Sequence, residues 1–302
     1  KGRASSIRAP ITGSCSTFTK GGAGTLTLSG ANTYTGLTTV NGGVLQVTHA
    51  SGLGTTAGGT VVASGATLYI DGVSIGNESV TLNGGTLSGA SASLLGNIAL
   101  TANSIINANA GSLFTLNGVI SGTGFGITKT GEGEVVLNNA TTYTGATVID
   151  AGTLTVTSGL DDAASVTVSS GATYNLEVSD TVASIGGAGN VTLNSYTLTV
   201  GDATNTTLSG NISGSGALIK QGSGILSLSG TNTYTGGTTL NSGTLNLASQ
   251  NALANNQMTS NGATLMMDTN VTYVPSLIVN GDVTLGSGIR TQGAQTYNGD
   301  LT

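Results

Sequence analysis

The sequence has very few of the residues on which nucleophilic catalysis and metal binding most often depend. Its 302 residues include one histidine, one cysteine, two prolines and no tryptophan. The single cysteine, Cys15, cannot form an internal disulfide, and we interpret it as a bystander near the N-terminus. His49 follows an expected strand and is interpreted as a solvated turn residue. A zinc site needs several Cys or His ligands, and a Ser-His-Asp or Cys-His centre needs a histidine base. We therefore predict no metal, no cofactor and no enzymatic activity.

Charge and long apolar runs are also scarce. Charged residues make up 7% of the chain, the formal net charge is −6 and the pI is near 4.4. Nucleic-acid recognition rests on Lys and Arg that neutralise phosphates, so a nucleic-acid partner is not expected. No segment approaches the roughly 18 consecutive apolar residues of a membrane helix, and residues 1–17 lack the apolar core of a signal peptide. We expect an exported chain of this kind to be a mature piece or an internal fragment.

Glycine, in contrast, is abundant, with 50 residues. Each glycine in a helix interior costs about 1 kcal/mol, so a helical protein is close to excluded. A mean hydropathy of +0.22 argues against charge-driven disorder, and the absence of a three-residue glycine period excludes collagen. The composition therefore predicts an all-β architecture with many tight turns.

An internal repeat is the main feature of the sequence. Three segments of equal length align without a gap and share K-x-G-x-G at the start, T-Y-T-G in the middle and G-x-L-x-[VL] at the end. They are KGGAGTLTLSGANTYTGLTTVNGGVLQV at 20–47, KTGEGEVVLNNATTYTGATVIDAGTLTV at 129–156 and KQGSGILSLSGTNTYTGGTTLNSGTLNL at 220–247. Intervening segments recur as well, and the final NGDLT resembles the beginning of a further copy, so we expect the chain to stop within a repeat.

The repeat predicts the organisation of the chain. Residues 1–17 are an atypical leader that we expect to be poorly ordered. Units then cover 18–126, 127–217 and 218–302, the last one truncated, in one continuous solenoid. The step from Lys20 to Lys129 is longer than the step from Lys129 to Lys220. We attribute the difference to one extra turn in the first unit.

A shorter spacing predicts the fold. The interval from Leu26 to Leu45 is the same as that from Leu226 to Leu245, and the strands between turns alternate aliphatic with hydroxyl residues. An element of about 19–23 residues with short strands and Gly or Asn corners matches one turn of a parallel β-solenoid. Period two places the aliphatic side chains in the lumen and the hydroxyls in water. The prediction is a single-stranded parallel β-helix of about 14 turns in which Leu26, Leu45 and Leu68 stack vertically.

The three segments resemble the autotransporter-associated β-strand repeat, also called the passenger-associated transport repeat. The strongest match is GTLTLSGANTYTGLTTVNGGVLQV at 24–47, and the middle copy departs from it with Glu132, Glu134 and two asparagines. The resemblance implies a right-handed parallel β-helix stalk at the surface of a Gram-negative bacterium, exported by type V secretion. It also implies a C-terminal outer-membrane translocator barrel, which we expect outside this chain.

Candidate functional residues are few. Glu132 and Glu134 stand at i and i+2 and could share a face, as the carboxylate pair of a glycosidase does. We interpret Asp161 and Asp162 as corner decoration.

The tyrosines of the T-Y-T-G motifs have two interpretations: exposed aromatic contacts for a glycan or protein, or structural residues that pack at a corner and bond the backbone. They lie about five turns apart and cannot form a continuous ladder, which favours the structural role. The repeat lysines are expected to be solvated charges that discourage sheet–sheet association. The residues concerned are Tyr34, Tyr143 and Tyr234, and Lys20, Lys129 and Lys220.

Three functions follow as hypotheses. The first is a non-enzymatic cell-surface or extracellular adhesin stalk that binds a host or environmental glycan or protein and supports its own export by folding outside the cell. The second is a subunit of a fibre or biofilm matrix that assembles through end-to-end or lateral contacts with itself. The third is a polysaccharide-active β-helix enzyme that uses Glu132 and Glu134.

Overall fold

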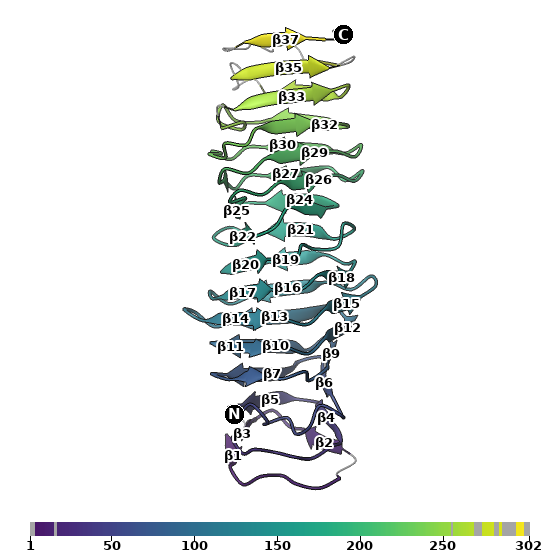
Figure 1. Cartoon of the computed structure of the whole chain (residues 1–302), viewed down its shortest axis with the longest axis vertical. Coiled ribbons are helices and arrows are strands. Elements are labelled where there is room, and N and C mark those ends of the chain that lie inside the picture. Colours follow the sequence, from purple (N-terminus) through teal and green to yellow (C-terminus); the bar gives the residue numbers. More distant parts are fainter. Residues whose placement is uncertain are drawn as a thin grey trace. The chain divides into compact units, whose positions relative to one another are not determined.

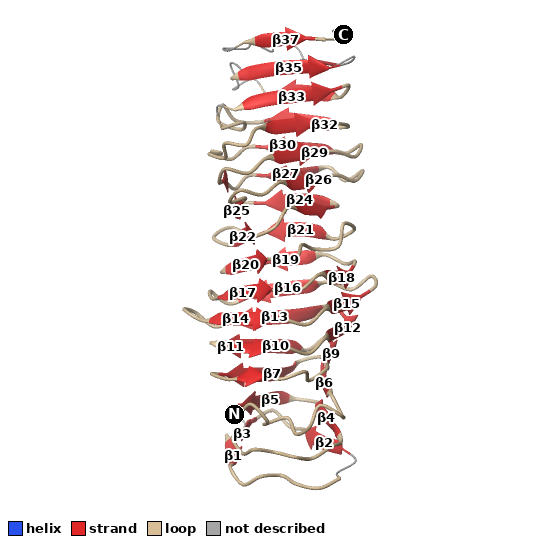
Figure 2. Ribbon diagram, viewed as in Figure 1, coloured by secondary structure: helices blue, strands red, loops and turns tan. Residues whose placement is uncertain are grey.

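The computed structural model is an all-β solenoid of parallel strands, with about 14 turns. It describes residues 4–14, 17–254, 256–268, 274–280, 284–285 and 294–298. No helix occurs among these residues (Figure 2). Cys15 lies outside them. The chain divides into two compact units, Lys1–Asp161 and Asp162–Thr302.

Unit 1 is wound from strands that recur on three sheets, A, B and C (Figure 1). Neighbouring strands within each sheet come from successive turns and pair in parallel. Sheet A contains β1 (Ser5–Ile7), β3 (Thr25–Leu28), β5 (Gly43–Val47), β7 (Ala66–Asp71), β10 (Thr86–Ala90), β13 (Ser104–Ala108), β16 (Ile127–Thr130) and β19 (Thr147–Ile149). Sheet B contains β2 (Thr17–Lys20), β4 (Leu37–Val40), β6 (Thr60–Ala63), β9 (Val80–Asn83), β12 (Ile98–Ala102), β15 (Ile120–Gly122) and β18 (Thr141–Tyr143). Sheet C contains β8 (Ser74–Ile75), β11 (Ala92–Leu94), β14 (Leu113–Leu116), β17 (Glu134–Leu137) and β20 (Thr153–Val156).

Unit 2 has the same construction, with strands of sheets A, C and D. Its strands of sheet A are β21 (Ser165–Val168), β24 (Ser184–Gly187), β27 (Thr206–Leu208), β30 (Ile225–Leu228), β32 (Thr244–Leu247), β34 (Thr264–Met267) and β36 (Thr284–Leu285). Those of sheet C are β22 (Thr173–Leu176), β25 (Asn190–Thr192) and β28 (Ile212–Ser213). Sheet D contains β23 (Asp180–Val182), β26 (Leu198–Val200), β29 (Leu218–Lys220), β31 (Thr238–Leu240), β33 (Gln257–Asn261), β35 (Ser276–Asn280) and β37 (Gln295–Tyr297).

The vertical stacking predicted from the leucine spacing is confirmed. On sheet A, Leu26 pairs with Leu45, Leu45 with Leu68 and Leu68 with Leu87. Leu45, Leu68 and Leu87 are fully buried. Because side chains alternate along a strand, this register keeps the stacked leucines Leu45, Leu68 and Leu87 in the lumen.

The separation of aliphatic and hydroxyl side chains holds for most strands but has an informative exception. In β7, Leu68 and Ile70 are buried while the intervening Thr67 and Tyr69 are partly exposed. Some threonines, however, face inward. Thr38 and Thr60 occupy paired inward positions of β4 and β6 and are buried. A buried hydroxyl needs a hydrogen-bond partner, so these positions indicate polar contacts inside the lumen.

Part of the predicted leader takes part in the solenoid. Residues Ser5–Ile7 form β1, which pairs with β3 in register, Ser5 with Leu26 and Ile7 with Leu28. The unit boundaries inferred from the repeat, at 126/127 and 217/218, remain a prediction.

Repeat copies do not all start on the same sheet. In unit 1, Lys20 ends β2 on sheet B, whereas Lys129 lies in β16 on sheet A. In unit 2, Lys220 ends β29 on sheet D. The repeat therefore encodes a local strand–corner–strand geometry that can be placed on different faces of the winding.

Candidate functional site

The three repeat tyrosines are buried, so the interpretation of them as surface-contact residues is wrong. Tyr34, Tyr143 and Tyr234 each have no exposed surface. Each hydroxyl pairs with the hydroxyl of the threonine four residues on, at 2.8 Å for Tyr34–Thr38 and 2.7 Å for Tyr143–Thr147. Tyr234 pairs with Thr238 in the same way. The large apolar ring is stabilised by burial, and the inward threonine satisfies its hydroxyl.

Packing and burial both act on these rings. Phe18 stacks on Tyr34 with ring centroids 5.5 Å apart. Burial raises the pKa of Tyr234 to about 12, although its hydrogen bond to Thr238 acts in the opposite direction. Tyr234 therefore remains neutral at any physiological pH, and the three buried rings act as packing residues.

A contrast between copies leads to a stability prediction. The residue twenty positions after the tyrosine is Gly54 in the first copy, at φ +82°, and Ala254 in the third, at φ +52°. A left-handed conformation costs a residue with a Cβ roughly 1–2 kcal/mol. We expect Ala254→Gly to raise the free energy of unfolding by about 1 kcal/mol, as measured by urea denaturation. The control is Ala252→Gly, at a buried position without positive φ, which should lower the free energy of unfolding. Equal effects of the two changes would contradict backbone strain at Ala254.

The repeat lysines are also buried, contrary to the expectation of solvated edge charges. Lys20 is 6% exposed, Lys220 2% and Lys129 not at all. Each ammonium donates hydrogen bonds to three backbone carbonyls: two directly after the lysine and one on the next turn. For Lys129 the acceptors are the carbonyls of Thr130 at 3.2 Å, Gly131 at 2.6 Å and Ala151 at 2.7 Å. The corresponding acceptors are Gly21, Gly22 and Gly42 for Lys20, and Gln221, Gly222 and Ser242 for Lys220.

We call this arrangement the lysine clamp: the repeat lysine and the three carbonyls that its ammonium bonds. Three acceptors match the three donors of an ammonium, which explains how a charge is tolerated without an ion-pair partner. Desolvation lowers the pKa of Lys129 to about 8, and the charges of Glu132 and Glu134 partly oppose it. Burial also lowers the pKa of Lys220, opposed by Asp202.

Two glycines per copy shape the clamp. The residue two positions after each lysine has positive φ, which turns its carbonyl toward the ammonium: Gly22, Gly131 and Gly222. The glycine of G-x-L-x-[VL] on the next turn also has positive φ: Gly43, Gly152 and Gly243. A Cβ on Gly152 would lie 2.7 Å from Lys129 Nζ and 2.3 Å from the carbonyl oxygen of Gly133. Close packing and left-handed backbone both require glycine here.

Of the two carboxylates proposed for glycoside hydrolysis, one makes a hydrogen bond between turns and the other is exposed. Glu134 accepts a hydrogen bond of 2.5 Å from the hydroxyl of Thr155 on the next turn, and Glu132 is exposed at the bend before β17. Both carboxylates contribute to the electrostatics of Lys129. Asp161 and Asp162 lie in the turn region after β20, and the Asp161 N–H donates to Thr141. His49 lies in the turn after β5, where its Nδ1 accepts a hydrogen bond from the Ser51 N–H.

Two buried acids were not expected from the sequence. Asp180 accepts a hydrogen bond from the buried Tyr174 hydroxyl. Glu78 is 2% exposed and accepts a 2.7 Å hydrogen bond from Thr60, the inward threonine of β6. Desolvation raises the pKa of Glu78, with the Thr60 bond acting against it. Across the described residues, no group of three His, Cys, Asp or Glu is arranged to hold a metal ion.

Glu78 gives a pH-dependent prediction. Because its pKa is higher in the folded chain than in the unfolded chain, the folded chain binds more protons just above pH 4.5, and stability falls as pH rises through that window. Glu78→Gln keeps an acceptor for Thr60 and removes the charge. We expect it to raise the free energy of unfolding at pH 7 by about 1 kcal/mol or less, since solvent screens part of the cost, with no gain at pH 4. Denaturation of both proteins at the two pH values tests this; a gain independent of pH would contradict it.

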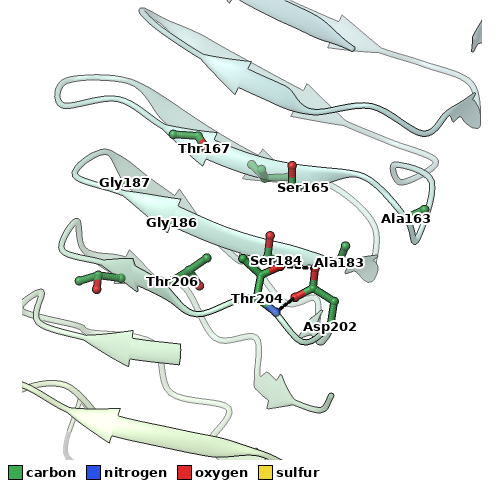
Figure 3. Close-up of a pocket in the computed structure, with 12 residues that line it drawn as sticks. Ala163, Ser165, Thr167, Ala183, Ser184, Gly186, Gly187, Asp202, Thr204 and Thr206 are labelled. Carbon is green, nitrogen blue, oxygen red and sulfur yellow. Dashed lines mark hydrogen bonds between the residues drawn. The ribbon is translucent and has the colours of Figure 1, made fainter. Parts of the chain in front are cut away.

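The outer surface of unit 2 contains a hollow. It is an open groove of about 540 Å³ over β21, β24 and β27 (Figure 3). Hydroxyl side chains line it, together with one carboxylate and the glycine backbone of β24. The lining residues are Ala163, Ser165, Val166, Thr167, Ala183, Ser184, Gly186, Gly187, Asp202, Thr204, Thr206 and Thr207.

The lysine-led segments match a known repeat family. Three copies of the passenger-associated-transport-repeat are found at residues 18–47, 127–156 and 218–247, each starting two residues before the lysine-led segment. All three matched segments lie within turns of the parallel β-solenoid.

A particular relative makes the comparison more specific. Over 246 residues, 74% of this chain, the sequence is 33% identical to the adhesin BmaC autotransporter of Brucella suis biovar 1 (strain 1330). The matched region is 7% of that protein, so the chain spans a small part of its relative's length. No solved structure matches the chain. No helix among the described residues is long and apolar enough to span a bilayer.

Proposed function

We propose that the chain is a non-enzymatic stalk segment of an autotransporter-like adhesin, displayed at the surface of a Gram-negative bacterium or released from it, and that it acts in adhesion. The observation that carries the proposal is the set of three passenger-associated transport repeats, each folded into solenoid turns. The description of the relative as an adhesin supports the adhesive role. The non-enzymatic role is supported by the hydrogen bond between Glu134 and Thr155, which commits one carboxylate of the candidate pair to the contact between turns.

Adhesion is tested with the purified chain immobilised on beads. We expect saturable attachment of the beads to host epithelial cells or to extracellular-matrix preparations. Beads coated with Leu245→Asp, which places a carboxylate at a fully buried lumen position, should attach less. Attachment that is equal for the two proteins, or absent for the wild type, would contradict an adhesive role of the folded solenoid.

We also propose that the segment supports its own export by folding outside the cell. Strands pair with those of the preceding and following turns, as β5 does with β3 and β7, so a turn can be added to one already folded. In a passenger exported by its own translocator, Leu245→Asp should reduce the amount at the cell surface. Thr244→Asp, which places the same carboxylate on the outer face of β32, is the matched control. Undiminished export of a non-folding Leu245→Asp chain would contradict the proposal.

Self-association is the second role that we propose, and an exposed leucine favours it. Leu113 is 46% exposed and borders an open groove of about 410 Å³ in unit 1, together with Val73 and Ala92. Exposed apolar surface of this kind often marks a protein contact. Sedimentation at rising concentration should show oligomers that Leu113→Thr weakens. A wild-type chain that stays monomeric throughout would exclude this role.

A further inference from the structure

We propose that the groove over β21, β24 and β27 binds an uncharged saccharide. The inference rests on the proposed adhesive function, because it names the ligand class that such an adhesin segment would recognise.

The groove exists because one outward side chain is missing. Thr167 on β21 pairs in register with Gly186 on β24, so the outer face loses its side chain at that point. Thr167 and Thr207 stand exposed on the two flanking strands. A Cβ on Gly186 would lie 3.1 Å from the carbonyl oxygen of Thr207 and 3.5 Å from Thr206 Cβ. Gly186 therefore forms the floor between two walls of threonine (Figure 3).

The lining favours a ligand rich in hydroxyl groups. A hydroxyl can both donate and accept, as each sugar hydroxyl can, although the Thr204 hydroxyl already donates to Asp202 and can only accept from a ligand. The residues that supply these hydroxyls are Ser165, Thr167, Ser184, Thr204, Thr206 and Thr207. No lysine or arginine lines the groove, so an anionic group finds no matching charge there.

Asp202 adds a fixed acceptor. Its Oδ1 accepts a 2.7 Å hydrogen bond from the Thr204 N–H, and its Oδ2 a 2.8 Å bond from the Thr204 hydroxyl. These two bonds hold the carboxylate in one orientation at the side of the groove (Figure 3). A carboxylate has further lone pairs, so it can accept from ligand hydroxyls while it repels an acidic ligand. The volume of about 540 Å³ lies within the usual range of small-molecule sites, which suits a short oligosaccharide.

The decisive variant is Gly186→Thr, which fills the groove with the side chain that neighbouring strands already carry. Threonine is favoured in strands and Gly186 has no positive φ, so we expect the variant to fold. Its Cβ would lie 3.1 Å from the carbonyl oxygen of Thr207, so that backbone must shift by a few tenths of an ångström, and Asp202→Asn, which adds no side-chain volume, is the second test of the site. An array of neutral, sialylated and sulfated oligosaccharides identifies the ligand, and calorimetry with the tightest neutral one gives the affinity. We expect Gly186→Thr to weaken binding at least tenfold and Asp202→Asn to weaken it several-fold.

The matched control is Gly76→Thr, the same substitution at a glycine of unit 1 with open space around its Cβ position; it should leave binding unchanged. Preference for anionic saccharides, the absence of any neutral ligand on the array, or equal affinity of wild type and Gly186→Thr would each overturn the inference. If Gly186→Thr beads still attach to cells as the wild type does, the saccharide site is wrong while the adhesive function stands. If no beads attach, the adhesive function itself is wrong.

Discussion

Replacing Lys129 with methionine should lower the free energy of unfolding by about 3 kcal/mol, although the change exchanges a buried charge for an apolar side chain of similar length. In the native chain the ammonium satisfies the carbonyls of Thr130, Gly131 and Ala151. Methionine keeps the apolar stem but has no donor, so three acceptors in a partly buried corner lose their partner at about 1 kcal/mol each. The pKa of about 8 means that the ammonium is charged at pH 7, where the measurement is made by urea denaturation.

The control for Lys129 is Thr128→Met, at the partly exposed neighbouring position of β16. It should change stability by less than about 1 kcal/mol, because the outward position has space and water. A Lys129→Met chain as stable as the wild type would show that desolvation of the charge outweighs its three hydrogen bonds, as occurs for some buried ion pairs. That result would contradict the stabilising role of the lysine clamp.

Gly152→Ala should lower the free energy of unfolding by about 3–4 kcal/mol, more than Lys129→Met does, because it combines overpacking with backbone strain. The added Cβ would lie 2.3 Å from the carbonyl oxygen of Gly133, 2.6 Å from that of Gly131 and 2.7 Å from Lys129 Nζ. None of these atoms is a free side-chain end, since two are backbone and the ammonium is held by three bonds. The left-handed backbone, at φ +65°, adds its own strain of about 1 kcal/mol.

A matched substitution separates strain from crowding. Gly171 also has positive φ, at +85°, but nothing lies within 4 Å of its Cβ position. Gly171→Ala should therefore lower the free energy of unfolding only by the strain of the left-handed backbone, about 1 kcal/mol. Chemical denaturation of both variants measures the difference; if the two losses are equal, the close packing of the clamp contributes nothing to stability.

The sequence was sufficient to predict the parallel solenoid and the register of its turns. Leucines that recur at a constant short interval, with alternating hydroxyl neighbours, predict a turn length and a lumen face, and the pairing of Leu26 with Leu45 follows from both. One residue of slip would move every leucine to the outer face, so the pattern specifies the register strongly. The resemblance to the transport repeat was equally accessible, because a long motif present three times is specific.

The lysine clamp was not predicted, because a charged lysine side chain is normally expected to be exposed to water. Its acceptors are backbone carbonyls, which have no sequence signature, and one of them comes from the next turn. A signal nevertheless exists: in every copy the lysine is followed by glycine at two positions, Gly131 and Gly152 in the middle copy, and both have positive φ. A lysine with one glycine two positions later and another a full turn later could have indicated carbonyls turned toward it.

The tyrosine motif held a similar signal. Each T-Y-T-G is followed by a threonine four residues after the tyrosine, as in Tyr143 and Thr147, and that threonine faces inward where an aliphatic residue was expected. The groove, in contrast, depends on which outward residue of β21 lies opposite Gly186. A missing outward side chain of this kind can be recognised as a groove only when the strand register is known.

In-register stacking of successive turns is the central claim, and disulfide trapping tests it most directly. Ser74 on β8 and Ser93 on β11 are partners on adjacent turns, with their hydroxyl oxygens 2.6 Å apart. In a Cys15→Ser background, the pair Ser74→Cys and Ser93→Cys should oxidise rapidly and almost completely, because parallel neighbours meet the distance requirement of a disulfide. The pair Thr81→Cys and Ser93→Cys, on sheets B and C, should not. Equal oxidation of the two pairs, or none of the first, would contradict the solenoid.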